Sequence, residues 1–366
     1  MLTNTLPVTP KELADLKDCI VVDISPKEDY ENWHINGSIN IDIYNDILSA
    51  NLHAAAQKLL QIKTDKKIVA VCNAGATAKI ASQMLQSQGK NSSYLEGGMM
   101  GWNRFHKTFT AFEDGDLIIK QVARLGKCCL SYLIASKSGK ECVVVDPSHF
   151  TEVYMDIAKE MGFKIKGVVE THVHTDHISG AKQLASIVNC EFYTPNENRA
   201  FTKIKEGDKI IISNVKLRVI GTPGHTNESI CLIINDKAIF TGDTLCLDGV
   251  GSPDLGGKEE TRINAEKLFE SINKIKVLDG NLLILPAHFH DSPSFPIAKK
   301  LNEINLDNLL RDSKEQFSDS ISSNPQSTPP NHAEIKKLNK NFSNTSRMQA
   351  EQLEFGQNRC GAKQIS

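Results

Sequence analysis

The chain has 366 residues, of which 40% are hydrophobic and 23% are charged, and its formal net charge is −2. One hydrophobic core rarely serves a chain of this length, so we expect two domains. The nearly balanced charge provides no basic field for nucleic acid, and no apolar run is long enough to span a bilayer. The composition therefore predicts a globular protein with neither a nucleic-acid nor a membrane partner.

The cysteines and the N-terminal residues indicate in which cellular compartment the protein is expected. The nine cysteines have no spacing typical of a disulfide framework, and several, such as Cys142 and Cys231, lie in apolar strand-like runs. The first ten residues lack the charged start and apolar core of a signal peptide. We therefore expect a cytoplasmic protein with reduced cysteines.

Residues 1–107 form the first predicted domain. Cys19–Asp23 and Lys67–Val71 have the pattern of short buried strands, and residues 78–88 have that of a helix. Cys72 lies between the second strand and the helix, where backbone N–H groups and the helix dipole stabilise a thiolate or a persulfide. The alternative is that Cys72 is only a small buried apolar residue.

This first segment resembles a single rhodanese domain over roughly residues 5–107. The matching features are Asp23, His34-Ile35, Gly37, the loop that begins at Cys72, and Gly97-Gly98 with Gly101-Trp102. The resemblance implies an α/β domain with a parallel sheet flanked by helices, and sulfur transfer through Cys72. The implied sulfur-binding loop consists of Asn73, Ala74, Gly75, Ala76, Thr77 and Ala78.

Two departures from the rhodanese pattern concern charge. Many family members carry Arg where this chain has Thr77, and Ser25 stands where an Arg often follows the first strand. Without these cations, an anion at the loop loses a partner. The departures argue against thiosulfate as the preferred donor, but not against sulfur transfer through Cys72.

Residues 109–366 form the second predicted domain, and the boundary region between the two domains ends in the turn signal Asp114-Gly115-Asp116. Strand patterns cover residues 117–122, 129–135, 141–145, 165–169, 209–213, 215–220, 238–240 and 282–285. Helical patterns cover residues 150–161 and the stretch that follows residue 177. Such blocks suit a two-sheet sandwich. A run rich in Ser and Pro, residues 322–330, predicts an exposed loop.

The densest cluster of candidate metal ligands lies in Thr171-His-Val-His-Thr-Asp-His177. It places His172, His174, Asp176 and His177 within six consecutive residues. Such side chains are costly to bury without partners, and a metal cation removes that cost. Imidazole suits zinc, iron, copper and nickel, and a carboxylate widens the choice toward iron. The alternative is a surface loop that is rich in histidine by chance.

Three residues downstream repeat the same local pattern. His225, Asp243 and His288 each follow an apolar strand and a turn that contains Gly or Pro. Small residues let the backbone turn sharply and approach a metal closely. Because side chains at strand ends can converge at one sheet edge, the pattern predicts a shared metal site.

The pattern His172-x-His174-x-Asp176-His177, followed by His225, Asp243 and His288, resembles the metallo-β-lactamase superfamily over roughly residues 109–366. The contexts Gly-Asp243-Thr-Leu and Pro-Ala-His288, and the ending Asn358-Arg-Cys360-Gly361, favour its persulfide dioxygenase and glyoxalase II branch. The resemblance implies an α+β fold, a four-layer αββα sandwich.

The resemblance also implies a function. If this chain is like persulfide dioxygenases, His172, His225 and Asp243 would hold one Fe(II), with zinc as the alternative metal. O2 then oxidises a thiol persulfide, such as glutathione persulfide, to sulfite and the free thiol. The remaining residues, His174, Asp176, His177 and His288, would orient the ligands or, as in glyoxalase II, bind a second metal for thioester hydrolysis.

Ligand types alone do not separate these two reactions, but the rhodanese-like segment favours the first. A persulfide on Cys72 could be supplied or consumed through a small thiol, and fusion raises the local concentration of that carrier. A third hypothesis is a sulfur carrier or persulfide sensor with a structural metal site. The excess of ligand-type residues argues against it. A homodimer is compatible with the sequence.

Ser252 concerns the choice of thiol. The segment Gly249-Val-Gly-Ser252-Pro-Asp254-Leu resembles a family segment that commonly has Arg at the position of Ser252. A cation there could bind the carboxylate of glutathione. Its loss predicts altered thiol selectivity, unless a different Lys or Arg takes its place.

Overall fold

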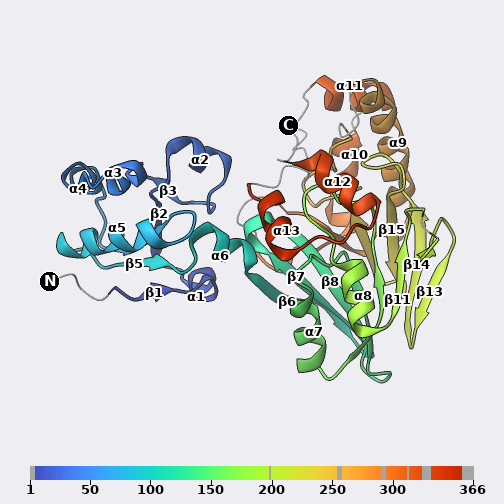
Figure 1. Cartoon of the computed structure of the whole chain (residues 1–366). Helices are drawn as coiled ribbons and strands as arrows, with labels where there is room; N and C mark the ends of the chain where they lie inside the picture. Colours follow the sequence, from blue (N-terminus) through green and yellow to red (C-terminus); the bar gives the residue numbers. More distant parts are fainter. Residues whose placement is uncertain are drawn as a thin grey trace. The chain divides into compact units, whose positions relative to one another are not determined.

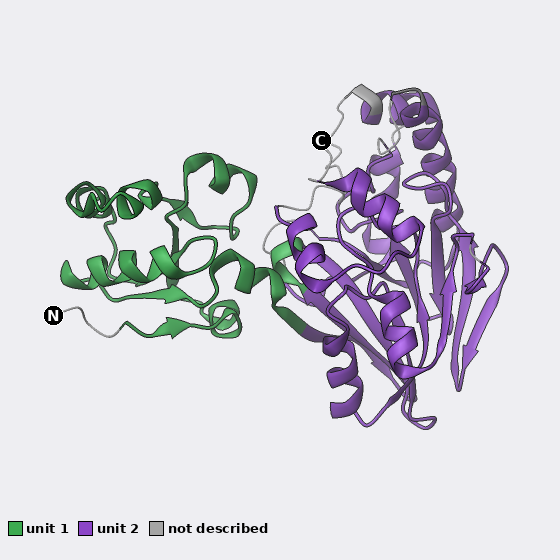
Figure 2. Cartoon of the chain, viewed as in Figure 1, with its two compact units in different colours: residues 1–107, 124–127 green, residues 108–123, 128–366 purple. Residues whose placement is uncertain are grey.

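The structure is a computed structural model that describes residues 5–197, 199–253, 258–289, 294–310, 313–323 and 331–356. The chain forms two compact units (Figure 2). Unit 1 comprises residues 1–107 and 124–127, and unit 2 comprises residues 108–123 and 128–366. None of the helices in the described part is long and apolar enough to cross a membrane.

Unit 1 is built on a five-stranded sheet in the order β1-β5-β4-β2-β3, with every pair of neighbours parallel. Its strands are β1 (Pro7–Val8), β2 (Cys19–Asp23), β3 (Ile39–Asn40), β4 (Lys67–Val71) and β5 (Ser92–Leu95). Its helices are α1 (Pro10–Asp15), α2 (Lys27–Asn32), α3 (Tyr44–Leu48), α4 (Leu52–Leu59), α5 (Ala76–Ser87) and α6 (Gly98–Arg104) (Figure 1).

Apolar side chains on the two faces of this sheet form separate cores. On one face, Ile68 and Ala70 of β4 pack with Leu85 of α5. On the other, Val69 and Val71 of β4 pack with residues of α1 and α6. Burial on both faces explains the continuous apolar run of β4, which is typical of parallel sheets.

The first sheet of unit 2 has seven strands in the order β12-β11-β10-β9-β8-β7-β6. The strands are β6 (His106–Asp114), β7 (Leu117–Arg124), β8 (Cys129–Ser136), β9 (Glu141–Val145), β10 (Lys164–Val169), β11 (Glu191–Thr194) and β12 (Thr202–Lys203). A short 3-10 helix, Leu125–Lys127, joins β7 to β8. Helices α7 (Thr151–Glu160) and α8 (Ala181–Val188) share a core with this sheet.

The second sheet of unit 2 has six strands in the order β13-β14-β15-β16-β17-β18. They are β13 (Lys209–Ile212), β14 (Val215–Gly221), β15 (Ile230–Ile234), β16 (Ala238–Gly242), β17 (Leu283–Pro286) and β18 (Lys299–Lys300). Helices α9 (Lys258–Lys276), α10 (Leu306–Leu310) and α11 (Lys314–Ser323) share a core with it, and a 3-10 turn covers Leu301–Glu303. The chain then forms α12 (His332–Lys340) and α13 (Arg347–Leu353).

One loop prediction needs correction. The Ser- and Pro-rich run was expected to be exposed from residue 322, but α11 continues to Ser323, and residues 324–330 lie outside the described part. The polar composition of this stretch also gave no prediction of helix α11. Phe317 and Ile321 lie four residues apart, so they share one helix face and are buried in the core of the second sheet.

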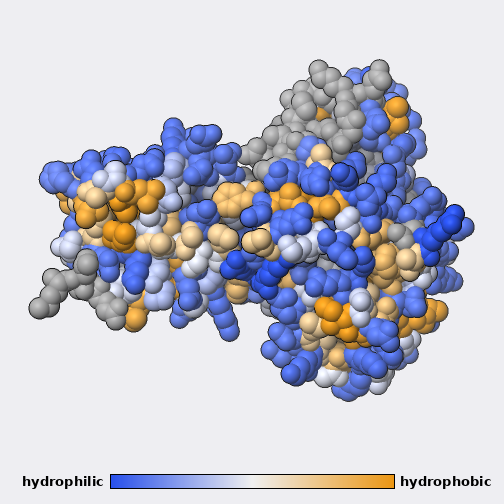
Figure 3. Space-filling model, in the orientation of Figure 1, coloured by the Kyte–Doolittle hydropathy of each residue, from blue (hydrophilic) through white to orange (hydrophobic). Residues whose placement is uncertain are grey.

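The surface on the visible face mixes hydrophilic residues with smaller hydrophobic patches (Figure 3). The exposed large hydrophobic residues of unit 1 include Leu48, Leu52 and Leu60. Scattered apolar residues of this kind are normal on a folded protein. The surface therefore does not by itself identify a functional site.

Candidate metal centre

Three strand ends of unit 2 bring together His172, His225 and Asp243. His172 follows β10, His225 follows β14, and Asp243 comes directly after β16. All three side chains are buried. The Asp243 Oδ2 atom lies 3.6 Å from His172 Nε2 and 3.3 Å from His225 Nε2. These three residues can hold one metal ion with one ligand atom each.

Hydrogen bonds on the far side of each ring fix which nitrogen faces the others. His225 Nδ1 donates to the carbonyl oxygen of Ser252 at 2.8 Å. Thr171 Oγ1 donates to Asp146 at 2.7 Å and therefore accepts from His172 Nδ1 at 2.9 Å. With Nδ1 carrying the proton in both rings, each Nε2 presents a lone pair to the site, as a metal ligand must.

The three facing atoms have no hydrogen-bond partner in the described part of the chain: His172 Nε2, His225 Nε2 and Asp243 Oδ2. Buried polar atoms without partners are destabilising, and a cation between these three would satisfy them all. Burial lowers the pKa of His172 to about 3, so its ring is neutral near pH 7. The donor set therefore fits a divalent metal, including iron.

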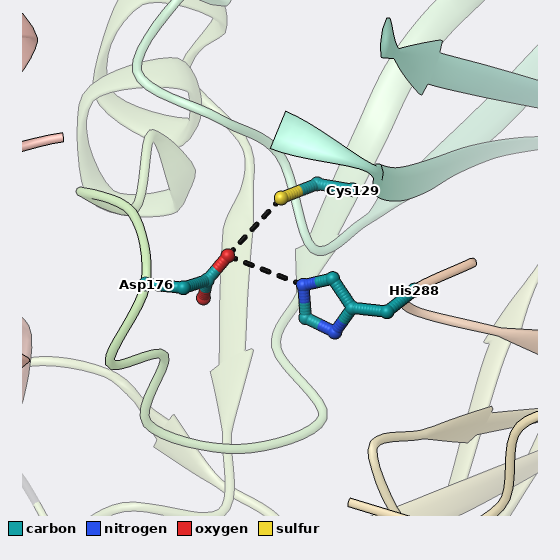
Figure 4. Close-up of side chains that lie close together, drawn as sticks. All are labelled: Cys129, Asp176 and His288. Carbon is teal, nitrogen blue, oxygen red and sulfur yellow. Dashed lines mark hydrogen bonds and ion pairs between the residues drawn. The ribbon is translucent and has the colours of Figure 1, made fainter. Parts of the chain in front are cut away.

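A second cluster lies beside the first, and Figure 4 shows three of its residues, Cys129, Asp176 and His288. Asp176 Oδ2 receives three hydrogen bonds: 3.1 Å from Cys129 Sγ, 3.1 Å from His288 Nε2 and 3.0 Å from His177 Nδ1. The other nitrogen of His288, Nδ1, lies 2.5 Å from Asp243 Oδ1. His288 thus connects the two clusters.

Charge pairing accounts for the protonation of this second cluster. Burial alone would lower the pKa of His288, but Asp243 and Asp176 raise it well above its usual value. Burial would likewise raise the pKa of Asp176, but His177 and His288 hold it well below its usual value. His288 therefore lies between two carboxylates that favour its protonated form.

The His174 ring is next to the His172 ring, with their centroids 4.3 Å apart, but His174 groups with Asp176 and His177 and not with the three facing ligands. Its Nε2 is 3.3 Å from Asp146 Oδ1, and its ring centroid is 4.4 Å from that of His177. Asp146 also accepts from the Thr171 backbone N–H at 2.8 Å. We did not single out Asp146 from the sequence, although it follows the apolar strand β9 just as the predicted ligands follow theirs.

Cys129 and Asn339 are further site residues that the sequence did not reveal. Asn339 of α12 donates from Nδ2 to the carbonyl oxygens of His174 and His177, at 2.9 and 2.8 Å. It lies more than 160 residues from them in the chain. Neither residue belongs to a local motif, so only tertiary structure identifies them.

Ser252 is buried, and its contact to the site is through its backbone carbonyl to His225. Asp254 and Leu255, and the Asn358-Arg-Cys360-Gly361 ending, lie outside the described residues. Lys336 and Lys340 of α12 line the same pocket as His225.

The Cys72 loop of unit 1 joins β4 to α5. Cys72 is 2% exposed, and its Sγ accepts the Gly75 backbone N–H at 3.1 Å. Gly75 has a φ of 91°, which favours glycine, and the loop carbonyls of Cys72 and Asn73 accept from Met99 N and Met100 N. In the same loop Thr77 and Ala78 are buried, whereas Asn73, Ala74 and Ala76 are exposed.

Comparisons with known proteins agree with these two units. A model of the rhodanese-like domain matches residues 9–105, and a model of the metallo-beta-lactamase superfamily matches residues 128–203. The chain belongs to the metallo-β-lactamase superfamily and also contains a rhodanese-like domain. Both predicted folds are therefore confirmed at the level of the family.

Two relatives carry the same printed description, persulfide dioxygenase ETHE1, mitochondrial. The Bos taurus protein is 31% identical over 207 residues, which are 55% of this chain and 79% of that relative. The Homo sapiens protein is 30% identical over the same shares of the two chains. The hydroxyacylglutathione hydrolase of Francisella tularensis subsp. novicida (strain U112) is 32% identical over 43% of this chain and 61% of that relative.

Among solved structures, a metallo-beta-lactamase from Staphylococcus aureus subsp. aureus COL is similar to this chain with a TM-score of 0.59. The two are 27% identical, and the match covers 64% of this chain and 75% of the other.

Proposed function

We propose that this protein is an iron persulfide dioxygenase with a rhodanese-type sulfurtransferase domain. The observation that carries the proposal is the open ligand set of His172, His225 and Asp243, in a chain similar to persulfide dioxygenases over 79% of their length. The net reaction converts a thiol persulfide, O2 and water to the free thiol, sulfite and two protons.

His172, His225 and Asp243 would hold a single Fe(II). When bound, the iron supplies electrons for O2 and open positions for the persulfide sulfur. The protein supplies two imidazoles that face the site through Nε2 and one carboxylate, whose Oδ1 atom is fixed by His288. Fixing that oxygen leaves Oδ2 as the ligand atom, so Asp243 is presented to the metal through one oxygen.

The hydrogen bonds of the second cluster support one metal per chain. Asp176 Oδ2 already receives donors from Cys129, His177 and His288. A second metal held by Cys129, Asp176 and His288 would have to displace these donors and remove a proton from His288, whose pKa is raised. The group of His174, Asp176 and His177 is the other place where a second metal could bind. No such cost applies to the first cluster.

The Cys72 loop supports sulfur transfer. The Gly75 N–H donates to Cys72 Sγ, and the first turn of α5 follows directly, so negative charge on a terminal sulfur would be stabilised there. Cys72 would carry the sulfane sulfur as a persulfide, and a small thiol would exchange it with the metal domain.

One alternative has its own support. The similarity to a hydroxyacylglutathione hydrolase, together with the presence of every side chain for a dinuclear site, favours a thioester hydrolase with a vestigial rhodanese domain. The alternative requires two metals per chain, so metal stoichiometry separates it from our proposal.

The first experiment is O2 consumption and sulfite release with glutathione persulfide, using full-length protein reconstituted anaerobically with Fe(II). The Zn(II) form is the control, because zinc has no redox chemistry. We expect iron-dependent O2 uptake with one sulfite per O2. No uptake with iron bound, together with hydrolysis of a glutathione thioester, contradicts the proposal and favours the alternative.

The sulfurtransferase domain is tested separately with Cys72→Ser. We expect loss of sulfur transfer to cyanide or a small thiol, with unchanged O2 uptake on free glutathione persulfide. Retained sulfur transfer in the variant would assign that activity to another residue.

A further inference from the structure

A pocket of about 320 Å³ in unit 2 is lined by helix α8 and by the segment that joins α12 to α13. Its lining includes His149, Ile178, Lys182, Ile187 and Thr345. None of the candidate metal ligands is among the described residues of this lining. The pocket is therefore a different site from the metal centre.

His149 is a buried histidine of this pocket, in the segment between β9 and α7. Its Nδ1 atom lies 3.0 Å from Glu354 Oε1, so this nitrogen carries a proton and donates to the carboxylate. Glu354 Oε1 also accepts from the Ile178 backbone N–H at 2.6 Å. The other ring nitrogen, Nε2, is buried and has no hydrogen-bond partner among the described residues. Such an atom is costly to bury, which favours a bound partner at Nε2.

Thr345 shares this feature, and Lys182 adds a positive charge. Thr345 Oγ1 is buried and has no hydrogen-bond partner in the described part of the chain. The Lys182 ammonium donates to the carbonyl oxygen of Phe342 at 2.8 Å and to Asn344 Oδ1 at 2.7 Å. These two bonds hold the ammonium beside Thr345 in the chain and use two of its three donors. Two unpartnered polar atoms and a fixed cation therefore belong to residues of one pocket.

The charges around this pocket favour a monoanion. Apart from His149, Lys182 is the only ionisable residue among the described residues of the lining. Two carboxylates lie behind the lining, Glu354 on His149 and Glu170 on the Ser179 hydroxyl, and they disfavour a polyanion. With a carboxylate behind it and an anion in front, the imidazole ring takes a second proton, and Nε2 then donates to the anion. The threonine hydroxyl and the third ammonium hydrogen are further donors.

The pocket also has an apolar part. Ile178 and Ile187 are among its lining residues, and Ile187 is 53% exposed. Covering this side chain removes apolar surface from water, which favours a ligand with a short aliphatic body.

We infer that this pocket binds a small aliphatic monocarboxylate. The carboxylate accepts from His149, Lys182 and Thr345, and the aliphatic body lies against the two isoleucines. The inference goes beyond the proposed function and does not depend on it, because no candidate metal ligand takes part.

The test uses two probes of the same shape, 4-methylpentanoate and 4-methylpentanamide, which differ in charge. Their dissociation constants are measured by NMR titration of full-length, zinc-loaded protein. We expect the carboxylate to bind with a Kd of about 1 mM and the amide to bind about tenfold more weakly. Equal binding of the two probes, or binding of neither, overturns the inference.

Three variants locate the binding. Thr345→Val removes the hydroxyl and keeps the shape of the side chain, and Lys182→Gln removes the cation. His149→Asn keeps a donor to Glu354 and removes Nε2. Each variant should weaken binding of the carboxylate by about tenfold. Lys159→Gln, on α7 and outside the described lining, is the matched control and should bind the carboxylate as the wild type does.

The variants also separate this pocket from the metal ion, to which a carboxylate could bind. Unchanged affinity in Thr345→Val and Lys182→Gln would assign the binding elsewhere and overturn the inference. If His149→Asn does not fold, these two variants decide. The measurement involves no turnover, so failure of the inference leaves the proposed function standing, and failure of the proposed function leaves the inference standing.

Discussion

The two halves of the histidine cluster use the same kinds of side chain in opposite ways. In the first half, His172, His225 and Asp243 turn ligand atoms toward one another and leave them without hydrogen-bond partners among the described residues. In the second half, Asp176 Oδ2 and both nitrogens of His288 have hydrogen-bond partners, and one donor to Asp176 is Cys129. Residue type therefore does not determine whether a histidine or an aspartate is a ligand.

The two halves differ in which histidine nitrogens act as hydrogen-bond donors. In the first half, the Nδ1 atoms of His172 and His225 donate hydrogen bonds to Thr171 and to the Ser252 carbonyl, so each Nε2 presents its lone pair to the site. In the second, both nitrogens of His288 face carboxylate oxygens, so the ring is a donor on both sides. Hydrogen-bonding partners outside the motif thus assign its members to different roles.

The largest effect should come from removing a first-half ligand. His225→Ala removes one of three ligand atoms, and we expect bound iron to fall from one per chain to near zero and turnover to fall by more than about 100-fold. Metal analysis after gel filtration and O2 uptake check this. The control is His332→Ala on α12, outside the site. Full iron content in His225→Ala would show that the ligand set is wrong.

His288→Ala should have an intermediate effect. The variant releases Asp243 Oδ1 but removes no ligand in our assignment. Iron affinity should therefore fall by about 10- to 100-fold, and excess iron should restore the content of one iron per chain. Iron titration by equilibrium dialysis measures both quantities. If excess iron restores nothing, His288 is itself a ligand and the contrast between the halves fails.

Asp146 tests the support of the metal loop. Asp146→Asn weakens the bonds from Thr171 and the pairing with His174, and we expect a loss of about 2 kcal/mol in the free energy of unfolding of metal-free protein. Urea denaturation gives the value. Asp236→Asn, at an exposed turn, is the control and should change stability by less than about 0.5 kcal/mol. Equal losses of unfolding free energy in the two variants would show that Asp146 does not support the metal loop.

The smallest effect is expected at Cys129. Cys129→Ser keeps a donor to Asp176, so we expect one iron per chain and turnover within about threefold of the wild type. Cys129→Ala removes the donor and should lower the free energy of unfolding by about 1 kcal/mol. Cobalt-substituted protein adds a spectroscopic check, because a thiolate ligand produces an intense charge-transfer band that Cys129→Ser would abolish. Such a band in the wild type would make Cys129 a ligand and the second half a metal site.

Much of the fold could be predicted from the sequence. The strands Cys19–Asp23, Lys67–Val71 and Glu141–Val145 have the predicted ends, because buried strands show as uninterrupted apolar runs bounded by turn residues. Helix α11 could not be predicted in the same way, since only Phe317 and Ile321 mark its buried face within a polar composition.

The sequence by itself identified the candidate metal ligands and Cys72, because His, Asp and Cys side chains after strand ends are recorded directly in the order of residues. It placed His172, His225 and Asp243 in one candidate site and Cys72 in another. Only the tertiary structure decided which atoms face a metal, because tautomer and orientation depend on Thr171, Asp146, the Ser252 carbonyl and His288. It also placed Cys129, Asn339 and the lysines of α12 beside the site, since contacts between distant segments arise from packing and have no signature in local sequence.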